Sequence, residues 1–169
     1  MSKIAHIKHR IRSVKNTRQI TKAMELVASS KMKRAQDRAI AGRDYALLLA
    51  RLLHIATTHA EIPNHPLMEK REVKRRGILV LSTDKGLCGP LNANLFREIN
   101  KIKGEADFVS VGRKAKQYLS RTGRNLVADF SVSDRVAFGE VRPIIEHMLE
   151  QYRSGRIDTL EVVFPRFIN

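Results

Sequence analysis

The first 59 residues contain no proline and only one glycine, Gly42, and their apolar residues recur every three or four positions. This spacing is typical of a helix that buries one stripe along its length. At 1.5 Å per residue such a helix would be roughly 85 Å long, and it needs a second long helix to cover its stripe. We therefore predict a coiled-coil helix over residues 1–59. Its apolar seam comprises Ile4, Ile7, Ile11, Val14, Ala28, Met32, Ala35, Ala39, Leu49 and Leu53.

The seam is interrupted by polar residues at Arg18, Thr21 and Glu25. Next to this interruption, Ile20, Met24 and Val27 form a second short apolar stripe on another face of the helix. The stripe is compatible with a stutter that adjusts the supercoil and with a separate contact surface. Both interpretations remain open at this point.

Pro63 and Pro66 end the helical pattern, because proline lacks an amide donor and restricts the residue before it. We assign residues 60–76 to a linker and residues 77–169 to a second domain. In that domain, apolar runs near residues 78, 108, 127 and 162 alternate with amphipathic segments. This alternation predicts a mainly parallel sheet with helices on its faces, which is an α/β, Rossmann-like fold.

Three glycines follow the predicted helices of this domain. Gly104, Gly123 and Gly155 each stand just past a helical pattern, where a left-handed cap is favoured. Pro90 suits the first position of a helix. Pro143 suggests that the last helix begins nearer Arg142.

The charge is strongly basic and concentrated in the first segment. The chain carries a net charge of +15, and residues 1–59 contribute 13 basic and 3 acidic residues. An acidic partner is therefore expected, and a basic coiled-coil protein that binds nucleic acid is the main alternative function. Only Tyr45 among the first 95 residues is aromatic, so a platform for base stacking is missing.

The loop STDKGLCGPLNANL follows the first predicted strand, at the position where α/β proteins hold phosphates. It lacks the glycine patterns of the known phosphate loops, so we expect Gly86 and Gly89 to form a structural turn. Asp84 has no second acid or base nearby in sequence, and the single cysteine, Cys88, forms no internal disulfide, which fits a reducing compartment. We predict no catalytic residue and no cofactor.

Other sites are not indicated by the sequence. His6 and His9 share a helical face without an accompanying carboxylate or cysteine, so we predict no metal site. No apolar run is long enough to span a membrane, and the N-terminus lacks the apolar core of a secretory signal. Direct membrane insertion is therefore not expected.

Two segments, IKHRIRSVKNTRQITKAMELVASSKMKRAQ and LSTDKGLCGPLNANL, closely resemble the gamma subunit family of the rotary (F-type) ATP synthase. The resemblance covers essentially the whole chain. It implies a non-catalytic central rotor shaft that couples ion flow through the membrane ring to ATP synthesis or hydrolysis in the alpha/beta ring. It also implies that the α/β domain is incomplete at its C-terminus, since the family continues beyond FPRFIN into a further helix.

The resemblance also implies partners and a location. The partners would be the alpha and beta subunits, the epsilon subunit and the membrane c-ring, with no nucleic acid bound. The chain would lie peripherally on the cytoplasmic face of the bacterial inner (plasma) membrane. Residues expected to face the alpha/beta ring are Arg18, Gln19, Lys22, Met24, Lys31, Lys33 and Arg34.

Overall fold

The computed structural model describes residues 3–59, 65–69 and 71–167. The chain divides into two compact units, Met1–Pro63 and Asn64–Asn169. Because each unit has its own internal contacts, each is considered by itself below.

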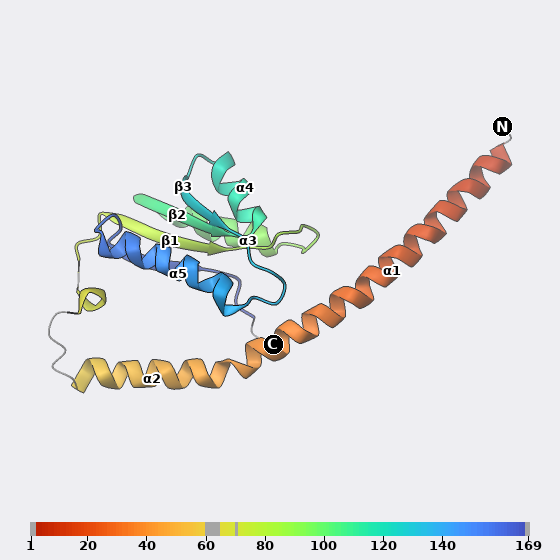
Figure 1. Cartoon of the computed structure of the whole chain (residues 1–169). Helices are drawn as coiled ribbons and strands as arrows, with labels where there is room; N and C mark the ends of the chain where they lie inside the picture. Colours follow the sequence, from red (N-terminus) through yellow and green to blue (C-terminus); the bar gives the residue numbers. More distant parts are fainter. Residues whose placement is uncertain (1–2, 60–64, 70, 168–169) are drawn as a thin grey trace. The chain divides into compact units, whose positions relative to one another are not determined.

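The first unit consists of two consecutive helices, α1 (Lys3–Ala41) and α2 (Arg43–His59), shown in Figure 1. The predicted long N-terminal helix is confirmed, with a turn at Gly42 that the prediction lacked. The helical hydrogen bonds pass through this turn, since the Gly42 amide donates to the Arg38 carbonyl at 3.1 Å and Ala46 donates to Gly42 at 3.1 Å. Glycine is a poor helix former, which explains why the irregularity falls at this residue.

The second unit is a four-stranded parallel sheet with the strand order β3-β2-β1-β4. The predicted α/β fold is confirmed. A short 3₁₀ helix, η1 (Pro66–Met68), precedes the sheet. The strands are β1 (Arg75–Leu81), β2 (Glu105–Val111), β3 (Asn125–Phe130) and β4 (Thr159–Val163), and the helices are α3 (Leu91–Lys101), α4 (Arg113–Arg121) and α5 (Phe138–Arg153).

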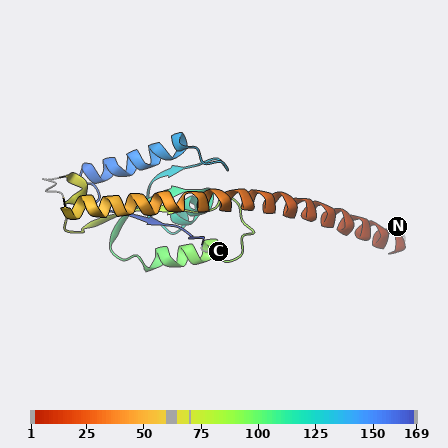
Figure 2. The same cartoon turned by 90° about the horizontal axis from the view of Figure 1, so that it is seen from below.

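Helices cover both faces of the sheet, as Figures 1 and 2 show, with α5 on one side and α3 and α4 on the other. Successive side chains along each strand point to opposite faces of the sheet and form two separate hydrophobic cores. Ile78 and Phe108 pack with α3 and α4, whereas Leu79 and Val109 pack with α5. Parallel strands buried on both faces explain the continuous apolar runs in the sequence.

The ends of the helices agree in part with the sequence. Gly104, Gly123 and Gly155 adopt positive φ angles of 84°, 66° and 74°, so the predicted left-handed caps are confirmed. The suggested start of α5 near Arg142 is wrong, because α5 begins at Phe138 and contains Pro143.

The early start of α5 is stabilised by Glu140. Its carboxylate accepts hydrogen bonds from the Ala137 amide at 2.7 Å and from the amide and hydroxyl of Ser133, each at 2.9 Å. These bonds favour the charged form and lower the pKa of Glu140. The carboxylate therefore fixes the loop that leads into the helix and satisfies the amide of its N-cap residue, Ala137.

A second carboxylate fixes the beginning of β1. Asp158 accepts hydrogen bonds from the amides of Lys74 and Arg75 at 2.9 and 2.8 Å, and the Arg75 bond is the main cause of its lowered pKa. Close by, Arg71 donates to the Tyr152 carbonyl at 2.6 Å, and its guanidinium lies 4.2 Å from the centre of the Tyr152 ring. The segment before β1 is thus held against the C-terminal end of α5.

Gly112, between β2 and α4, allows the loop after β1 to approach its backbone closely. Its φ is 96°, and a Cβ atom at this position would collide with the Ser82 carbonyl oxygen and lie 2.9 Å from Ser82 Oγ. The Ser82 hydroxyl accepts a hydrogen bond from the Ala115 amide at 2.8 Å. The absence of a side chain at Gly112 therefore lets the loop after β1 contact the first turn of α4.

We predict that Gly112→Ala destabilises the second unit by about 3 kcal/mol, from a strained φ and the collision with Ser82. Gly123→Ala is the matched control, because its φ is also positive but no atom lies within 4 Å of an added Cβ. The control should lose only about 1 kcal/mol. Urea denaturation of both variants measures the free energy of unfolding. Equal decreases in the two variants would show that the contact with Ser82 does not contribute to the destabilisation.

Candidate partner-binding surface

The apolar seam of α1 and α2 lies uncovered among the described residues. Its large side chains are between 51% and 69% exposed. A soluble protein rarely leaves so long an apolar stripe in water unless it is a binding surface. The seam residues with large side chains are Ile4, Ile7, Ile11, Val14, Met32, Leu49 and Leu53. The small seam residues Ala28, Ala35 and Ala39 are exposed as well.

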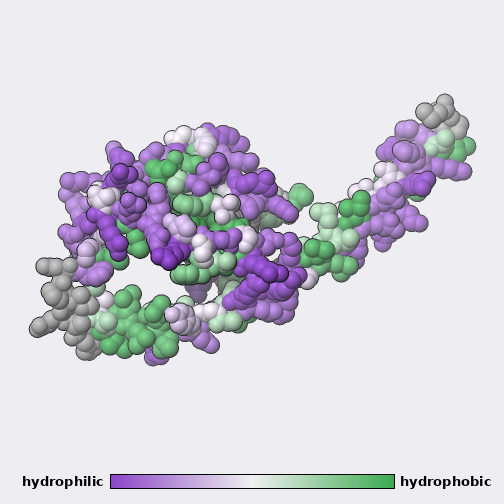
Figure 3. Space-filling view, in the orientation of Figure 1, coloured by the Kyte–Doolittle hydropathy of each residue, from purple (hydrophilic) through white to green (hydrophobic). Residues whose placement is uncertain are grey.

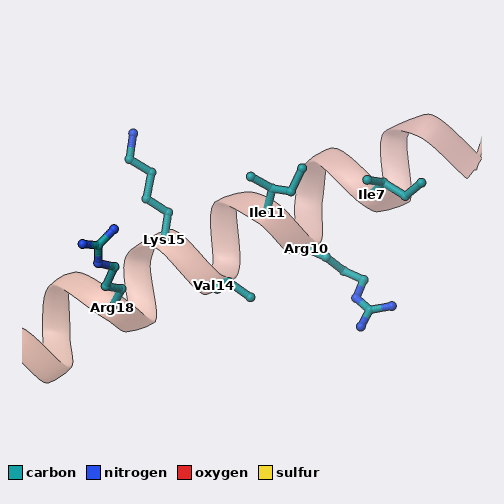
Figure 4. A pocket seen from close by; sticks show the side chains of 6 residues that line it. All are labelled: Ile7, Arg10, Ile11, Val14, Lys15 and Arg18. Atoms are coloured by element: carbon teal, nitrogen blue, oxygen red, sulfur yellow. The ribbon is translucent and has the colours of Figure 1, made fainter.

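The first part of the seam forms a shallow open hollow on one face of α1, seen in Figure 4. Its walls are Ile7, Ile11 and Val14 together with the stems of basic side chains. Figure 4 shows these side chains standing on a single helix. The hollow is the kind of surface that receives apolar side chains of a partner helix.

The basic residues of this region are largely available for a partner. Within the described part of the chain, Lys8, Arg10, Arg12, Lys15 and Arg18 have no carboxylate at ion-pairing distance. Further along α1, Lys22 pairs with Glu25 at 3.1 Å. The beginning of α1 therefore combines an apolar seam with uncompensated positive charge.

The predicted contact residues follow on the same helix. Lys33 pairs with Asp37 at 3.0 Å, and Arg34 donates to the carbonyl and hydroxyl oxygens of Ser30 at 3.3 and 3.2 Å. Gln19 and Lys22 line a second shallow hollow, which Arg18 also borders. Lys31 is exposed on the same helix.

The second stripe, Ile20, Met24 and Val27, is as exposed as the seam, with exposed fractions of 61%, 61% and 58%. In these turns the seam positions are polar, so the stripe is an exposed apolar surface displaced around α1 from the seam on either side of it. Such a displacement fits both a stutter and a separate contact surface.

α2 is apolar over most of its circumference. Leu48, Leu52 and Ile55 are exposed beside the seam residues Leu49 and Leu53. Figure 3 shows the resulting green stretch over α2. One partner helix covers only a narrow stripe, so α2 has apolar surface for more than one contact.

The loop from Ser82 to Pro90 begins at the carboxyl end of β1, and β1 lies next to β4 in the sheet. Between these two strands the connecting helices change from one face of the sheet to the other. Ligands of α/β proteins commonly bind at this point. The loop's own groups contact the start of α4, the helix that follows the neighbouring strand β2: Asp84 Oδ1 accepts from the Arg113 amide at 3.0 Å, and the Thr83 carbonyl accepts from the Lys114 amide at 3.1 Å. The Ser82 hydroxyl accepts from the next amide, that of Ala115. The first three amides of α4 therefore already have hydrogen-bond acceptors within the protein.

The same loop is stiffened from within. Asn92 donates to Thr83 Oγ1 at 2.7 Å and to Cys88 Sγ at 3.2 Å. Cys88 is therefore a half-buried hydrogen-bond acceptor. Gly89 has a φ of 58°, and Leu87 has the same unusual φ with a fully exposed side chain.

Chemistry at other places is not indicated by the geometry. Among the described residues, no group of three or more His, Cys, Asp or Glu side chains is arranged to hold a metal ion. In the same part of the chain, no helix is long and apolar enough to cross a membrane. Asp84 serves as a helix cap, so its carboxylate already has a structural role.

Two residues that shape the loop were not identified from the sequence. Gly112 had a usable signal, since it directly follows the apolar run DFVSV and precedes a helical pattern. Asn92 had none, because its contacts with Thr83 and Cys88 depend on how the loop folds back on the first turn of α3.

Comparison with known proteins gives a consistent result. The family described as ATP synthase matches residues 3–169. Over its whole length the chain is 54% identical to the ATP synthase gamma chain of Opitutus terrae and 43% identical to that of Methylacidiphilum infernorum. Over 95% of its length it is 42% identical to the ATP synthase gamma chain of Heliobacterium modesticaldum.

The similarity covers only part of these relatives. The chain spans 58%, 60% and 57% of the three gamma chains, which is somewhat less than two thirds of their length.

We predict that this chain alone binds neither ATP nor ADP, because the amides at the start of α4 already bind Ser82, Thr83 and Asp84. Isothermal titration calorimetry with each nucleotide measures this. A dissociation constant in the micromolar range, about −8 kcal/mol, would show that the loop rearranges into a phosphate site. Asp84→Ala is a useful companion variant, because it frees one amide.

Proposed function

Because the chain belongs to the ATP synthase gamma-chain family, we propose that it serves as the central rotor shaft of an ATP synthase, without catalytic residues of its own. In this proposal it couples ion flow through a membrane ring to ATP synthesis or hydrolysis in a surrounding alpha/beta ring. The observation that carries the proposal is the long N-terminal helix with its seam and basic residues exposed. A chain with this surface needs surrounding protein.

The proposed mechanism is differential contact. A shaft that touches the catalytic subunits unequally biases each nucleotide site toward a different affinity, and rotation moves that bias from site to site. The exposed apolar stripe around Met24 supports this role, because it lies on another face of α1 than the seam and is therefore available to the ring when a partner covers the seam. The basic charge of α1 fits acidic segments in that ring.

The partners would be the alpha and beta subunits, the epsilon subunit and the membrane c-ring. The residues proposed to face the alpha/beta ring remain those expected from the resemblance: Arg18, Gln19, Lys22, Met24, Lys31, Lys33 and Arg34. In a bacterial cell the chain would lie peripherally on the cytoplasmic face of the inner membrane, held there by the complex. The compact second unit would carry the contacts to the c-ring and epsilon subunit.

We predict that Met24→Lys, in an assembled complex containing this chain, lowers the coupling ratio of proton pumping to ATP hydrolysis by about tenfold. A lysine places charge on an apolar surface whose contacts must change during rotation. Met24→Leu is the matched control and should keep coupling, since it conserves volume and apolarity. Pumping in inverted vesicles, measured beside hydrolysis, gives the ratio; unchanged coupling in the lysine variant would exclude Met24 from the moving contact.

The alternative function is nucleic-acid binding through the basic residues of α1, which the similarity to ATP synthase gamma chains does not favour. Such binding weakens steeply with salt, by about 10³-fold or more between 50 and 200 mM when six or more phosphates are contacted. We predict no tight binding of single-stranded or duplex DNA in a salt titration followed by fluorescence anisotropy. Tight binding with this steep dependence would favour the alternative.

A further inference from the structure

The charges beside the apolar seam follow a rule. When the seam is written as a heptad abcdefg with Ile4 at position a, positions e and g border the seam on its two sides. The first three e positions are all lysine, and the first complete heptad carries arginine at g. These residues are Lys8, Lys15 and Lys22 at e, and Arg10 at g.

Acidic residues are absent from these borders throughout the described part of the first unit. Of the three acidic residues between positions 3 and 59, Asp37 and Asp44 fall at f, the position farthest from the seam, and Glu25 falls at a. The remaining charged border residues, Lys3, Lys31, Arg38 and Arg43, are basic as well. The seam is thus bordered by positive charge alone.

Figure 4 shows this arrangement on the structure, with Lys15 leaving one side of the helix beside Ile11 and Arg10 leaving the other side. Lys8, Arg10 and Lys15 have no ion-pair partner among the described residues. Lys22 is paired with Glu25 within the helix, so its charge is partly compensated. The strongest positive border therefore lies along the first two heptads.

Border charges decide which helices pair in a coiled coil. In an antiparallel pair e faces e of the partner and g faces g, and in a parallel pair g faces e. A second copy of this chain would place lysine or arginine opposite lysine or arginine in either orientation. Like charges in these positions oppose association, while opposite charges favour it.

We propose that the seam of α1 binds an amphipathic helix with glutamate or aspartate at its own border positions, and that Lys8, Arg10, Lys15 and Lys22 exclude a second copy of this chain. The inference rests on the proposed function only for the premise that another helix covers the seam. It adds the chemistry of that helix, and it identifies the border lysines as specificity-determining residues.

The test uses the full chain and three synthetic peptides of four heptads with identical a and d residues. Their e and g positions are all glutamate, all glutamine or all lysine. By isothermal titration calorimetry at low salt, the glutamate peptide should bind about tenfold more tightly than the glutamine peptide, and the lysine peptide should not bind. The advantage should shrink as salt is added, since the pairs are exposed. Equal affinities for the three peptides would overturn the proposal.

A charge-reversed chain makes the test specific to the border. Lys8→Glu, Lys15→Glu and Lys22→Glu together should invert the preference, so that the lysine peptide binds and the glutamate peptide does not. The matched control carries Arg12→Glu, Ser13→Glu, Asn16→Glu and Arg51→Glu, which change the net charge by the same amount at positions away from the border. The control should still prefer the glutamate peptide; loss of preference in both variants would mean that only net charge matters.

Two further measurements test whether a second copy of the chain or a nucleic acid binds the seam instead. Sedimentation of the chain alone should show less self-association at low salt than at high salt, because screening removes the repulsion. A tight dimer at low salt would overturn the exclusion of a second copy. Duplex DNA that displaces the glutamate peptide from the chain, but not from the charge-reversed chain, would identify the border as a nucleic-acid surface and overturn the proposal.

The outcome is distinguishable from a failure of the proposed function. If the chain assembles with ATP synthase subunits and shows coupling, but does not discriminate among the peptides, only the inference about the border charges fails. If the peptides are discriminated but assembly does not occur, the rotor proposal fails and the border rule stands. Circular dichroism of the charge-reversed chain confirms in each case that α1 and α2 are still helical.

Discussion

The exposed apolar seam of α1 and α2 is the constraint on which the behaviour of the first unit depends. A helix gains most of its stability in a protein from the packing of its apolar face, and here the measured seam side chains are more than half exposed. The internal contacts that α1 does show are short-range ion pairs such as Lys22–Glu25 and Lys33–Asp37, which contribute only a few tenths of a kcal/mol each. Burial of the apolar seam by a partner would therefore add to the stability of α1 and α2.

The second unit is built on the opposite principle. Its sheet is covered on both faces, and core residues such as Ile78, Phe108 and Leu119 have essentially no exposed surface. The loops at its ends are fixed by their own polar groups, as in the contacts of Glu140 with Ser133 and of Asp84 with Arg113. The chain thus joins an α/β unit whose sheet is covered on both faces to a helical segment whose apolar seam is exposed.

Much of this architecture could be predicted from the sequence, because it rests on periodicity and on residues with special backbone preferences. The spacing of three and four residues indicated the long helix, and Gly104, Gly123 and Gly155 indicated helix ends, since left-handed φ angles favour glycine. The sequence predicts too late a start for α5 because Pro143 is a local signal. The interaction that overrides it, the bonding of Glu140 to Ser133, depends on the shape of a loop seven residues earlier in the chain.

The candidate surface could be predicted in its residue types but not in its surroundings. The apolar seam and the basic residues are visible in the sequence, whereas the availability of Lys8 and Lys15 required knowing which carboxylates lie within reach. The role of Asp84 was likewise hidden, because its partner Arg113 is 29 residues away and meets it only where Gly112 permits close approach. Contacts between segments distant in sequence are set by tertiary packing, which local patterns do not encode.

The strand order has a consequence for how the second unit is made. β1 is the first strand to leave the ribosome, and β2 and β3 can join it on one side through α3 and α4 as synthesis proceeds. Its other side stays open until β4, at Thr159–Val163, has been translated and has aligned with Arg76–Val80. During that interval β1 is paired on one side only and forms an open edge of the nascent sheet, so a chaperone would protect this edge while residues 131–158 are translated.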